Sequence, residues 1–383
     1  MRMNVFFDCR YVRWTTHDGV SRYSVGVVTA LAELTNVTML ISDERQLEQL
    51  PARPWVLVPG PADVREAVMS YYVNRLKPDV VVTPMQTMGS LGRRYPLVLT
   101  VHDLIYYRHR TPPRDLPLWL RAVWRAYHLT WWPQRVLLNR ADAVAVVSET
   151  TRDLVAEHRL TRRPLILAPN ASSLVPDAPY EPIPHGDRSP DLVYMGSFMP
   201  YKNVETLVGA MNQLPAYRLH LMSNVAPEVR ARLEALSSAA NLVFHDGAGD
   251  EEYVSLVSGA TALVSASFDE GFGIPLVEAM ALGTPVVVSD IDIFREVAGG
   301  AGAFFDPRDV GALVAAVRSL ESESAWSSLS TRSVARAARW NWDRTAQQLF
   351  DGLTELLGTG GGAPSTGGTT PGTATDIGTA TDA

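Results

Sequence analysis

The sequence predicts an α/β fold built from two doubly wound, Rossmann-like domains that face each other across a central cleft. Short apolar segments alternate with helical ones along most of the chain, the pattern of parallel strands that helices cover on both faces. At 383 residues the chain is also longer than one hydrophobic core usually organises. A Pro-rich segment, Pro169 to Pro190, is typical of a linker and separates the two halves.

Each half has its own series of apolar strands bounded by turn residues. The strands expected in the first half are Val5–Phe7, Val37–Ile41, Trp55–Val58, Val80–Val82, Leu97–Val101 and Ala143–Val147. Those of the second half are Leu192–Met195, Leu219–Met222, Leu242–Phe244, Ala262–Ser265 and Val286–Ser289, with helices such as Asn203–Leu214 and Glu228–Ser237 between them. Ligands of open parallel sheets bind at the carboxyl ends of the strands, so both sets of strand ends should line the cleft.

The expected boundaries are residues 1–180 and 181–340 for the two domains. A helix over 341–357 should then pack back toward the N-terminal domain. Residues 358–383 are mostly Gly, Thr, Ala, Pro and Ser, and such a tail has too few apolar residues to order itself.

The composition excludes several classes of protein and of site. The formal net charge of −7 gives no global basic field for nucleic acid. The single cysteine, Cys9, excludes an internal disulfide and a cysteine-based zinc cluster, and we expect it to be a packing residue. No apolar run reaches the ~20 residues that span a bilayer, and Met1–Asp8 resembles a strand more than a signal peptide. We therefore expect a cytoplasmic protein, with attachment to the inner face of the membrane left open.

The most informative segment runs from Phe268 to Glu278. An apolar strand leads into a Gly-rich turn, and the turn opens a helix with Pro275 at its expected first position. The free N–H groups and the dipole of such a helix start attract phosphate, and Gly271 and Gly273 allow a ligand close to the backbone. Glu270 and Glu278 flank this position, which suits a diphosphate with hydroxyls at both ends. The simpler alternative is an ordinary α/β turn whose acidic residues face the helix dipole.

A family resemblance rests on several segments in order. The stretch from Asp269 to Val286, Asp-Glu-Gly-Phe-Gly-Ile-Pro-Leu-Val-Glu-Ala-Met-Ala-Leu-Gly-Thr-Pro-Val, resembles the Glu-x7-Glu signature of retaining glycosyltransferases of family 4, which have the GT-B fold. Further matching segments are Asp18–Tyr23, Val101–Leu104, Val147–Thr151, Pro169–Ala171, and Tyr194–Gly196 through Lys202–Asn203. Their order and spacing cover nearly the whole chain before the tail.

The resemblance implies a nucleotide-sugar donor on the C-terminal domain and an acceptor on the N-terminal domain. Glu278 would hold the ribose hydroxyls. Glu270 would bind hydroxyls of the transferred sugar and support charge at its anomeric carbon. Backbone N–H groups from Phe272 through Gly273 to Ile274 would receive the sugar and the diphosphate.

The remaining roles implied by the resemblance come from both domains. Gly19 would approach the diphosphate, and His102 would reach the donor sugar. Lys202 would neutralise the diphosphate as it leaves, and Gly196 and Ser197 would border the donor. Two of these have plainer alternatives, because a lone histidine is more often structural and Lys202 could be a solvated surface lysine.

The sequence departs from the family pattern at three positions. The family usually has an arginine at the place of Ser197 or of Tyr201, so half of the expected cationic clamp is missing. Asp18 replaces the first glycine of the N-terminal loop. Because a carboxylate there would repel phosphate, we expect it to turn away or to cap the following helix.

The segment Pro113–Arg140 has two open interpretations. It carries basic residues and tryptophans at helical spacing, namely Trp119, Arg121, Trp124, Arg125, His128, Trp131 and Trp132. A basic helix with interfacial aromatics can lie on an anionic membrane, which would favour a lipid-linked acceptor. Alternatively, an ordinary amphipathic helix packs its tryptophans on the sheet. Asp103, Arg121 and Arg125 are the candidates on the acceptor side.

We expect no metal or other cofactor. Asp290 and Asp292 have the Asp-x-Asp spacing that holds a divalent ion in another glycosyltransferase fold, but GT-B enzymes generally do without it. Asp103, Asp142, His109 and His128 show no metal-ligand spacing that we recognise.

These observations predict a retaining glycosyltransferase that moves a hexose, mannose from GDP-mannose in the first instance, to a hydroxyl of a glycan or lipid-linked acceptor. The motif around Phe272 and the Lys202-Asn203 pair most resemble mannosyltransferases. The rivals are a catalytically weak GT-B scaffold subunit, which the missing arginine motivates, and a nucleotide-sugar epimerase of the same fold. A dehydrogenase is disfavoured because no Gly-x-Gly-x-x-Gly follows the first strand.

Overall fold

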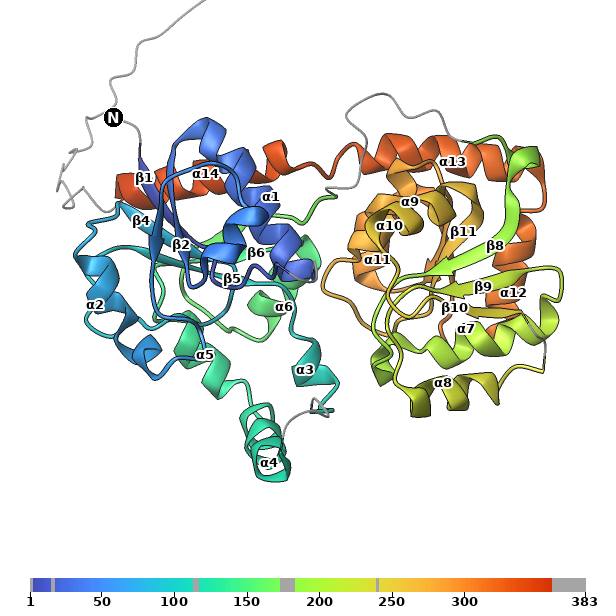
Figure 1. Ribbon diagram of the computed structural model, residues 1–383, viewed down its shortest axis with the longest axis horizontal. Coiled ribbons are helices and arrows are strands. Elements are labelled where there is room, and N and C mark those ends of the chain that lie inside the picture. Colours follow the sequence, from blue (N-terminus) through green and yellow to red (C-terminus); the bar gives the residue numbers. More distant parts are fainter. Residues whose placement is uncertain (1–2, 15–17, 113–116, 173–182, 239–240, 360–383) are drawn as a thin grey trace, which may run out of the picture.

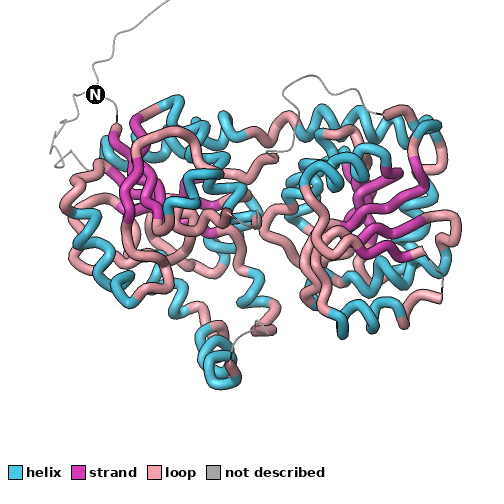
Figure 2. The backbone as a smooth tube through the Cα atoms, in the orientation of Figure 1, coloured by secondary structure: helices cyan, strands magenta, loops and turns pink. Residues whose placement is uncertain are grey.

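Two parallel-sheet domains lie side by side in the computed structural model, which describes residues 3–14, 18–112, 117–172, 183–238 and 241–359 (Figure 1). Met1, the start of the Pro113–Arg140 segment, residues 173–182 of the Pro-rich segment and the tail from 360 lie outside the described residues. In each domain the strands occupy the middle and helices surround them (Figure 2).

Both sheets have doubly wound topology. The N-terminal sheet has the order β3-β2-β1-β4-β5-β6-β7 and the C-terminal sheet β10-β9-β8-β11-β12-β13, with every pairing parallel. The first sheet comprises β1 (Asn4–Asp8), β2 (Asn36–Ile41), β3 (Trp55–Leu57), β4 (Val80–Thr83), β5 (Leu97–Val101), β6 (Ala143–Val146) and β7 (Leu165–Leu167). The second comprises β8 (Ser189–Tyr194), β9 (Arg218–Leu221), β10 (Leu242–Phe244), β11 (Ala260–Ser265), β12 (Val286–Ser289) and β13 (Gly302–Phe305).

The predicted two-domain α/β fold is therefore confirmed, and each strand expected from the sequence is present within a few residues of its bounds. Two strands were missed. β7 is an apolar run of only three residues after Pro164, and β13 begins with Gly302-Ala303, so neither gives a long apolar run. Both lie at sheet edges, where pairing with one neighbour suffices.

Helices cover both faces of each sheet (Figure 1). Those of the N-terminal half are α1 (Gly19–Leu34), α2 (Met69–Asn74), α3 (Ile105–Arg108), α4 (Leu118–Tyr127), α5 (Trp132–Leu138) and α6 (Glu149–Glu157). Those that follow are α7 (Val204–Ala210), α8 (Pro227–Glu234), α9 (Asp250–Gly259), α10 (Ile274–Ala281), α11 (Asp292–Ala298), α12 (Val310–Ser319), α13 (Glu323–Ala337) and α14 (Trp342–Thr359). Short 3₁₀ turns are η1 (Glu44–Glu48), η2 (Val64–Val68), η3 (His185–Asp187), η4 (Pro200–Lys202), η5 (Met211–Gln213) and η6 (Gly299–Ala301).

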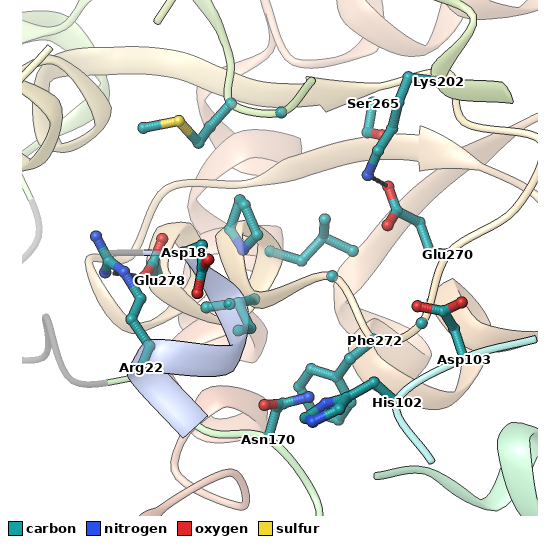
Figure 3. Close-up of a pocket in the computed structure, with 18 of the residues that line it drawn as sticks. Asp18, Arg22, His102, Asp103, Asn170, Lys202, Ser265, Glu270, Phe272 and Glu278 are labelled. Carbon is teal, nitrogen blue, oxygen red and sulfur yellow. Dashed lines mark hydrogen bonds and ion pairs between the residues drawn. The ribbon is translucent and has the colours of Figure 1, made fainter. Parts of the chain in front are cut away.

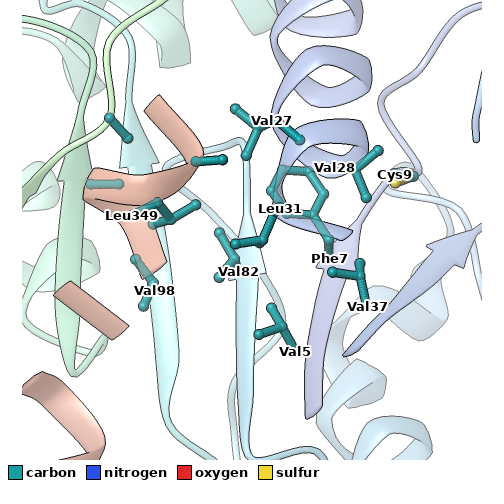
Figure 4. Close-up of a cluster of buried hydrophobic side chains, with 14 of the residues drawn as sticks. Val5, Phe7, Cys9, Val27, Val28, Leu31, Val37, Val82, Val98 and Leu349 are labelled. Carbon is teal, nitrogen blue, oxygen red and sulfur yellow. The ribbon is translucent and has the colours of Figure 1, made fainter. Parts of the chain in front are cut away.

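The last helix crosses from the C-terminal domain and lies along the N-terminal one (Figure 1). Leu349 and Leu353 of α14 are fully buried in the same cluster as Val27 and Leu31 of α1 (Figure 4). A Cβ at Gly26 would stand 2.2 Å from the Trp342 ring, so only glycine allows these two helices to approach so closely. The chain thus joins the two domains both before β8 and after α13.

Cys9 is a buried member of this same cluster, as expected of a packing residue (Figure 4). Burial raises the pKa of its thiol well above the usual value. Over the described residues, no helix is long and apolar enough to cross a bilayer.

Candidate active site

A cavity of about 620 Å³ lies between the domains at the carboxyl ends of their strands. The N-terminal domain contributes Gly19, Arg22, His102, Asp103 and Asn170 among others, and the C-terminal domain contributes the residues around Lys202, Ser265 and the segment from Glu270 to Glu278 (Figure 3). Nearly all the candidates from the sequence meet here: Gly19, His102, Asp103, Gly196, Lys202, Glu270, Phe272, Gly273, Ile274 and Glu278.

Helix α10 begins at the centre of this cavity. Its N-cap, Gly273, has a left-handed φ of 93°, which favours glycine, and no side chain caps the helix. Pro275 is the second helical residue, one position later than predicted. A Cβ at Gly271 would stand 2.9 Å from the His102 carbonyl oxygen, so this turn touches the backbone of the opposite domain. The helix start is thus open to an anion.

Glu278 marks one end of the cavity. It is buried on α10, with a side chain 4% exposed, and its Oε1 accepts a 3.0 Å hydrogen bond from Nη1 of Arg22. Nη2 of Arg22 donates to Asp250 at 2.8 Å. Burial raises the pKa of Glu278, and the Arg22 charge opposes that rise. An arginine of the N-terminal domain therefore holds the carboxylate that the resemblance assigns to ribose.

Glu270 and Lys202 mark the other end (Figure 3). Nζ of Lys202 lies 2.5 Å from Oε1 of Glu270, and both side chains are largely buried. The Ser267 hydroxyl donates to the same Oε1 at 2.9 Å. The interpretation of Lys202 as a solvated surface lysine is therefore wrong, because it lies in the cavity and pairs with the expected catalytic carboxylate.

His102 lines the cavity wall as a neutral imidazole. Its Nε2 is 2.8 Å from the carbonyl oxygen of Pro84, and its ring packs edge-on against Tyr23. Burial lowers the pKa of His102 to about 4, so the ring is uncharged near neutral pH. Because a carbonyl can only accept, Nε2 carries the hydrogen and Nδ1 is left as an acceptor.

Asp103 borders the cavity beside the Gly271 turn. Its Oδ1 accepts from the backbone N–H of Ile105, the first residue of α3, at 3.1 Å. Burial raises the pKa of its carboxyl above the ordinary value. Asp18 behaves as expected of a cap, since its Oδ1 accepts from Ser21 N at 2.8 Å and closes the first turn of α1.

Three of the predicted site residues lie away from the cavity. Ser197 is exposed on the strand-to-helix turn after β8 and does not line it. Arg121 and Arg125 lie on α4, which projects from the N-terminal domain (Figure 1). The structure thus brings neither of these arginines to the donor cavity.

The interpretation of the Pro113–Arg140 segment as an amphipathic helix that packs its tryptophans on the sheet is wrong for Trp119 and Trp132. Trp119 of α4 is 68% exposed, and Trp132, the first residue of α5, is 67% exposed. Trp131 does pack inward, stacked between Tyr107 and His158 at 4.2 Å from each ring. The outward face of α4 is apolar and aromatic, because Leu118 and Val123 are exposed beside Trp119.

Sequence reasoning missed several residues of the cavity. Arg22 lies three positions after Gly19 within a segment that carries the resemblance, but its partner is 256 positions away. Asn170 lies in the Pro169–Ala171 segment and lines the wall. Ser265 lines the cavity at the end of β11, and Ser267 follows two residues later.

Over the described residues, no group of three His, Cys, Asp or Glu side chains could hold a metal ion. Asp290 pairs instead with Arg295, whose Nη2 is 2.6 Å from Oδ2. Asp292 is the first residue of α11. The Asp-x-Asp pair thus has a local structural explanation.

Both halves of the chain match known protein families. Residues 17–173 match the model for Glycosyltransferase Family 4, and residues 181–340 match the model for Glycosyl transferases group 1. Both domains are glycosyltransferase domains. Together with the two facing Rossmann-like sheets, these matches confirm the GT-B fold.

The curated relatives of these domains include mannosyltransferases. The serotype-specific mannosyltransferase WbdA of Escherichia coli is 32% identical over 169 residues, which are 41% of this chain and 21% of that protein. The O-antigen chain mannosyltransferase RfbU of Salmonella typhimurium is 24% identical over 354 residues, 88% of this chain and 96% of that protein. The chain thus spans about a fifth of WbdA and nearly all of RfbU.

Solved structures share the fold. Sucrose-phosphate synthase from Thermosynechococcus elongatus has a TM-score of 0.72 at 18% identity, covering 94% of this chain and 100% of that one. Alr3699/HepE from Anabaena was solved in complex with UDP and glucose. It has a TM-score of 0.69 at 17% identity, and the match covers 92% of this chain and 99% of that chain.

Proposed function

We propose that the protein is a retaining glycosyltransferase that transfers a hexose, mannose from GDP-mannose in the first instance, to a hydroxyl of a glycan or lipid-linked acceptor. One observation carries the proposal. A single cavity holds a carboxylate at each end, Glu278 and Glu270, with the uncapped start of α10 between them. A nucleotide-sugar has the matching order of ribose hydroxyls, diphosphate and sugar hydroxyls. The mannosyltransferase relatives support the choice of sugar.

The residues have distinct tasks in this proposal. The helix start and Lys202 stabilise the negative charge that builds on the departing diphosphate, and the helix start does so without reorganising. Glu270 binds sugar hydroxyls and stabilises positive charge at the anomeric carbon. Nδ1 of His102, the free acceptor, takes a hydrogen bond from another sugar hydroxyl. In this proposal Lys202 and the helix start supply the positive charge, and no metal takes part.

Transfer with retention then follows a front-face route. The acceptor oxygen bonds to the anomeric carbon on the side from which the phosphate oxygen leaves, and that oxygen takes the acceptor proton. Closing the cleft around both substrates excludes water, which would otherwise compete as the acceptor.

The test is incubation of the purified protein with GDP-mannose, UDP-glucose and other nucleotide-sugars, followed by assay of nucleotide release and of the anomeric configuration of the product. Slow release of one nucleotide with retained α-configuration is expected. An inverted product would refute retention, and an epimerised free nucleotide-sugar would identify an epimerase. If none of the compounds bound, the scaffold alternative suggested by Ser197 and Tyr201 would replace this proposal.

We also propose that the outward face of α4 contacts an anionic membrane, which would bring a lipid-linked acceptor to the cleft. Leu118 is 80% exposed and Trp119 is nearly as exposed, while Arg121 and Arg125 lie on the same helix. Apolar and aromatic side chains beside arginines suit the lipid interface.

Sedimentation with vesicles tests this contact. The wild type should sediment with vesicles rich in phosphatidylserine and remain free with purely zwitterionic ones, and Trp119→Ser should weaken binding. Leu236→Ser, which changes an exposed apolar residue on the other domain, is the control. Equal binding by the wild type and Trp119→Ser would contradict the proposed contact.

A further inference from the structure

The charges that line the cavity do not suit a diphosphate as they stand. Among the described lining residues, four carboxylates face two permanent cations, Arg22 and Lys202, and Arg13 outside the lining pairs with one of the four, Asp18. The carboxylates are those of Asp18, Asp103, Glu270 and Glu278. A ligand with about two negative charges would enter a site that is already acidic, so both cations should be needed to hold it.

Both cations are already paired, each with one of the carboxylates assigned to ligand hydroxyls. Lys202 holds Glu270 at the sugar end, and Arg22 holds Glu278 at the ribose end. Figure 3 shows the two pairs on opposite sides of the cavity. Each pair therefore occupies one oxygen of a carboxylate that a bound donor would use.

We propose that Arg22 is the second cation of the diphosphate site, and that donor binding moves its guanidinium from Glu278 to the diphosphate. This inference rests on the proposed function. Ribose hydroxyls would take the place of Arg22 on Glu278, so the buried carboxylate keeps hydrogen-bond donors throughout. The same exchange at the other end would free Lys202 as sugar hydroxyls reach Glu270.

The placement of Arg22 suits this exchange. It lies in the first turn of α1, three residues after Gly19, which borders the same cavity. Its side chain is 15% exposed, while its second partner, Asp250, is 54% exposed, so solvent screens that contact. A guanidinium can also bind phosphate through two parallel hydrogen bonds.

The exchange would supply the second cation that the C-terminal domain lacks. Ser197 and Tyr201 occupy the two positions where the family resemblance leads us to expect an arginine. Because Arg22 comes from the N-terminal domain, the donor would be held by both domains. Binding of the diphosphate would then favour the closed cleft, whereas binding of a nucleoside alone would not.

Calorimetric titration of the full chain with GDP and with guanosine, and with UDP and uridine, tests the proposal. For the diphosphate that the wild type binds, Arg22→Gln should weaken binding about tenfold to a hundredfold, the effect of losing a charged hydrogen-bond partner. The affinity for the matching nucleoside should stay the same or increase, because Glu278 no longer pairs with Arg22. Arg22→Lys should restore part of the loss.

Two further variants separate this role from a structural one. Asp250→Asn removes the partner that holds Arg22 away from the diphosphate, so it should bind the diphosphate at least as tightly as the wild type. Arg53→Gln, which breaks the exposed pair between Arg53 and Glu33 of the same helix α1, is the matched control and should bind normally.

Three results would overturn the inference: unchanged diphosphate affinity in Arg22→Gln, equal loss for diphosphate and nucleoside, or weakening by Asp250→Asn. None of these three results would contradict the proposed function. If the wild type bound none of the nucleoside diphosphates, the proposed function would fail as well.

Discussion

Replacement of Glu278 by glutamine should raise the KM for the donor while leaving kcat nearly unchanged. Glutamine keeps the shape of this buried side chain but removes the charge that strengthens hydrogen bonds from ribose. A hydrogen bond to a charged group contributes about 1.5–3 kcal/mol, and each 1.4 kcal/mol is about a factor of ten. The donor KM should therefore rise about tenfold to a hundredfold. Turnover should persist because the reacting carbon lies at the Glu270 end.

The same substitution also breaks the ion pair with Arg22, so its effect on stability must be separated from its effect on binding. Loss of one partner of a fully buried pair costs about 3–5 kcal/mol. Here the cost should be smaller, because Arg22 keeps Asp250 as a partner and is partly exposed. Thermal melting shows whether the variant is folded, and steady-state kinetics over a range of donor concentrations gives KM and kcat.

The exposed, ion-paired Glu234 on α8 provides the control, and Glu234→Gln should keep the wild-type KM. A folded Glu278→Gln protein with an unchanged KM would refute the assignment of this carboxylate to ribose. A fall in kcat at constant KM would move Glu278 to the reacting end of the donor.

Three further predictions follow from the site. Glu270→Gln should lower kcat about a hundredfold to a thousandfold with little change in donor KM, as expected when one group that stabilises transition-state charge is removed; single-turnover kinetics checks this. Gly271→Ala should lower kcat without unfolding either domain, because its Cβ would stand 2.9 Å from the His102 carbonyl oxygen and force the cleft apart; melting curves and kcat measured together test it. Burial raises the pKa of Asp269 to about 6, so the folded protein holds this proton more tightly than the unfolded chain. As the pH falls from 6 to 4.5, the stability of the wild type relative to Asp269→Asn should rise by at most about 1.4 kcal/mol per pH unit, and urea unfolding that shows a constant difference would contradict this.

Much of this fold could be predicted from the sequence because parallel strands buried on both faces leave apolar runs. β12 is fully buried and its Val286-Val-Val288 run was recognised, whereas β13 starts with Gly302 and was not. The position of the cleft at the carboxyl ends of the strands followed from the general rules of doubly wound sheets.

The site was predicted where its residues are close in sequence, as in the turn from Glu270 to Glu278. It could not be predicted where a contact joins the domains. The Arg22–Glu278 pair spans 256 positions, and the Arg108–Asp269 pair spans 161. Such pairs depend on how two separately folded units meet, which neither periodicity nor local spacing encodes.

The exposed face of α4 also could not be predicted from local sequence. The sequence predicts a basic helix rich in tryptophan, but which tryptophans are covered depends on distant segments. Trp131 is covered because Tyr107 and His158 lie on either side of it, while Trp119 on the preceding helix stays exposed.

The central claim is that the interdomain cavity binds a nucleotide-sugar with ribose at Glu278 and sugar at Glu270. Calorimetric titration with GDP-mannose, and with UDP-glucose as the competing donor, tests it most directly in the wild type and in Glu278→Gln. We predict saturable binding of one of the two nucleotide-sugars at a single site and a tenfold or greater loss of affinity in the variant. Absence of binding by both compounds, or equal affinity in the wild type and the variant, would contradict the claim.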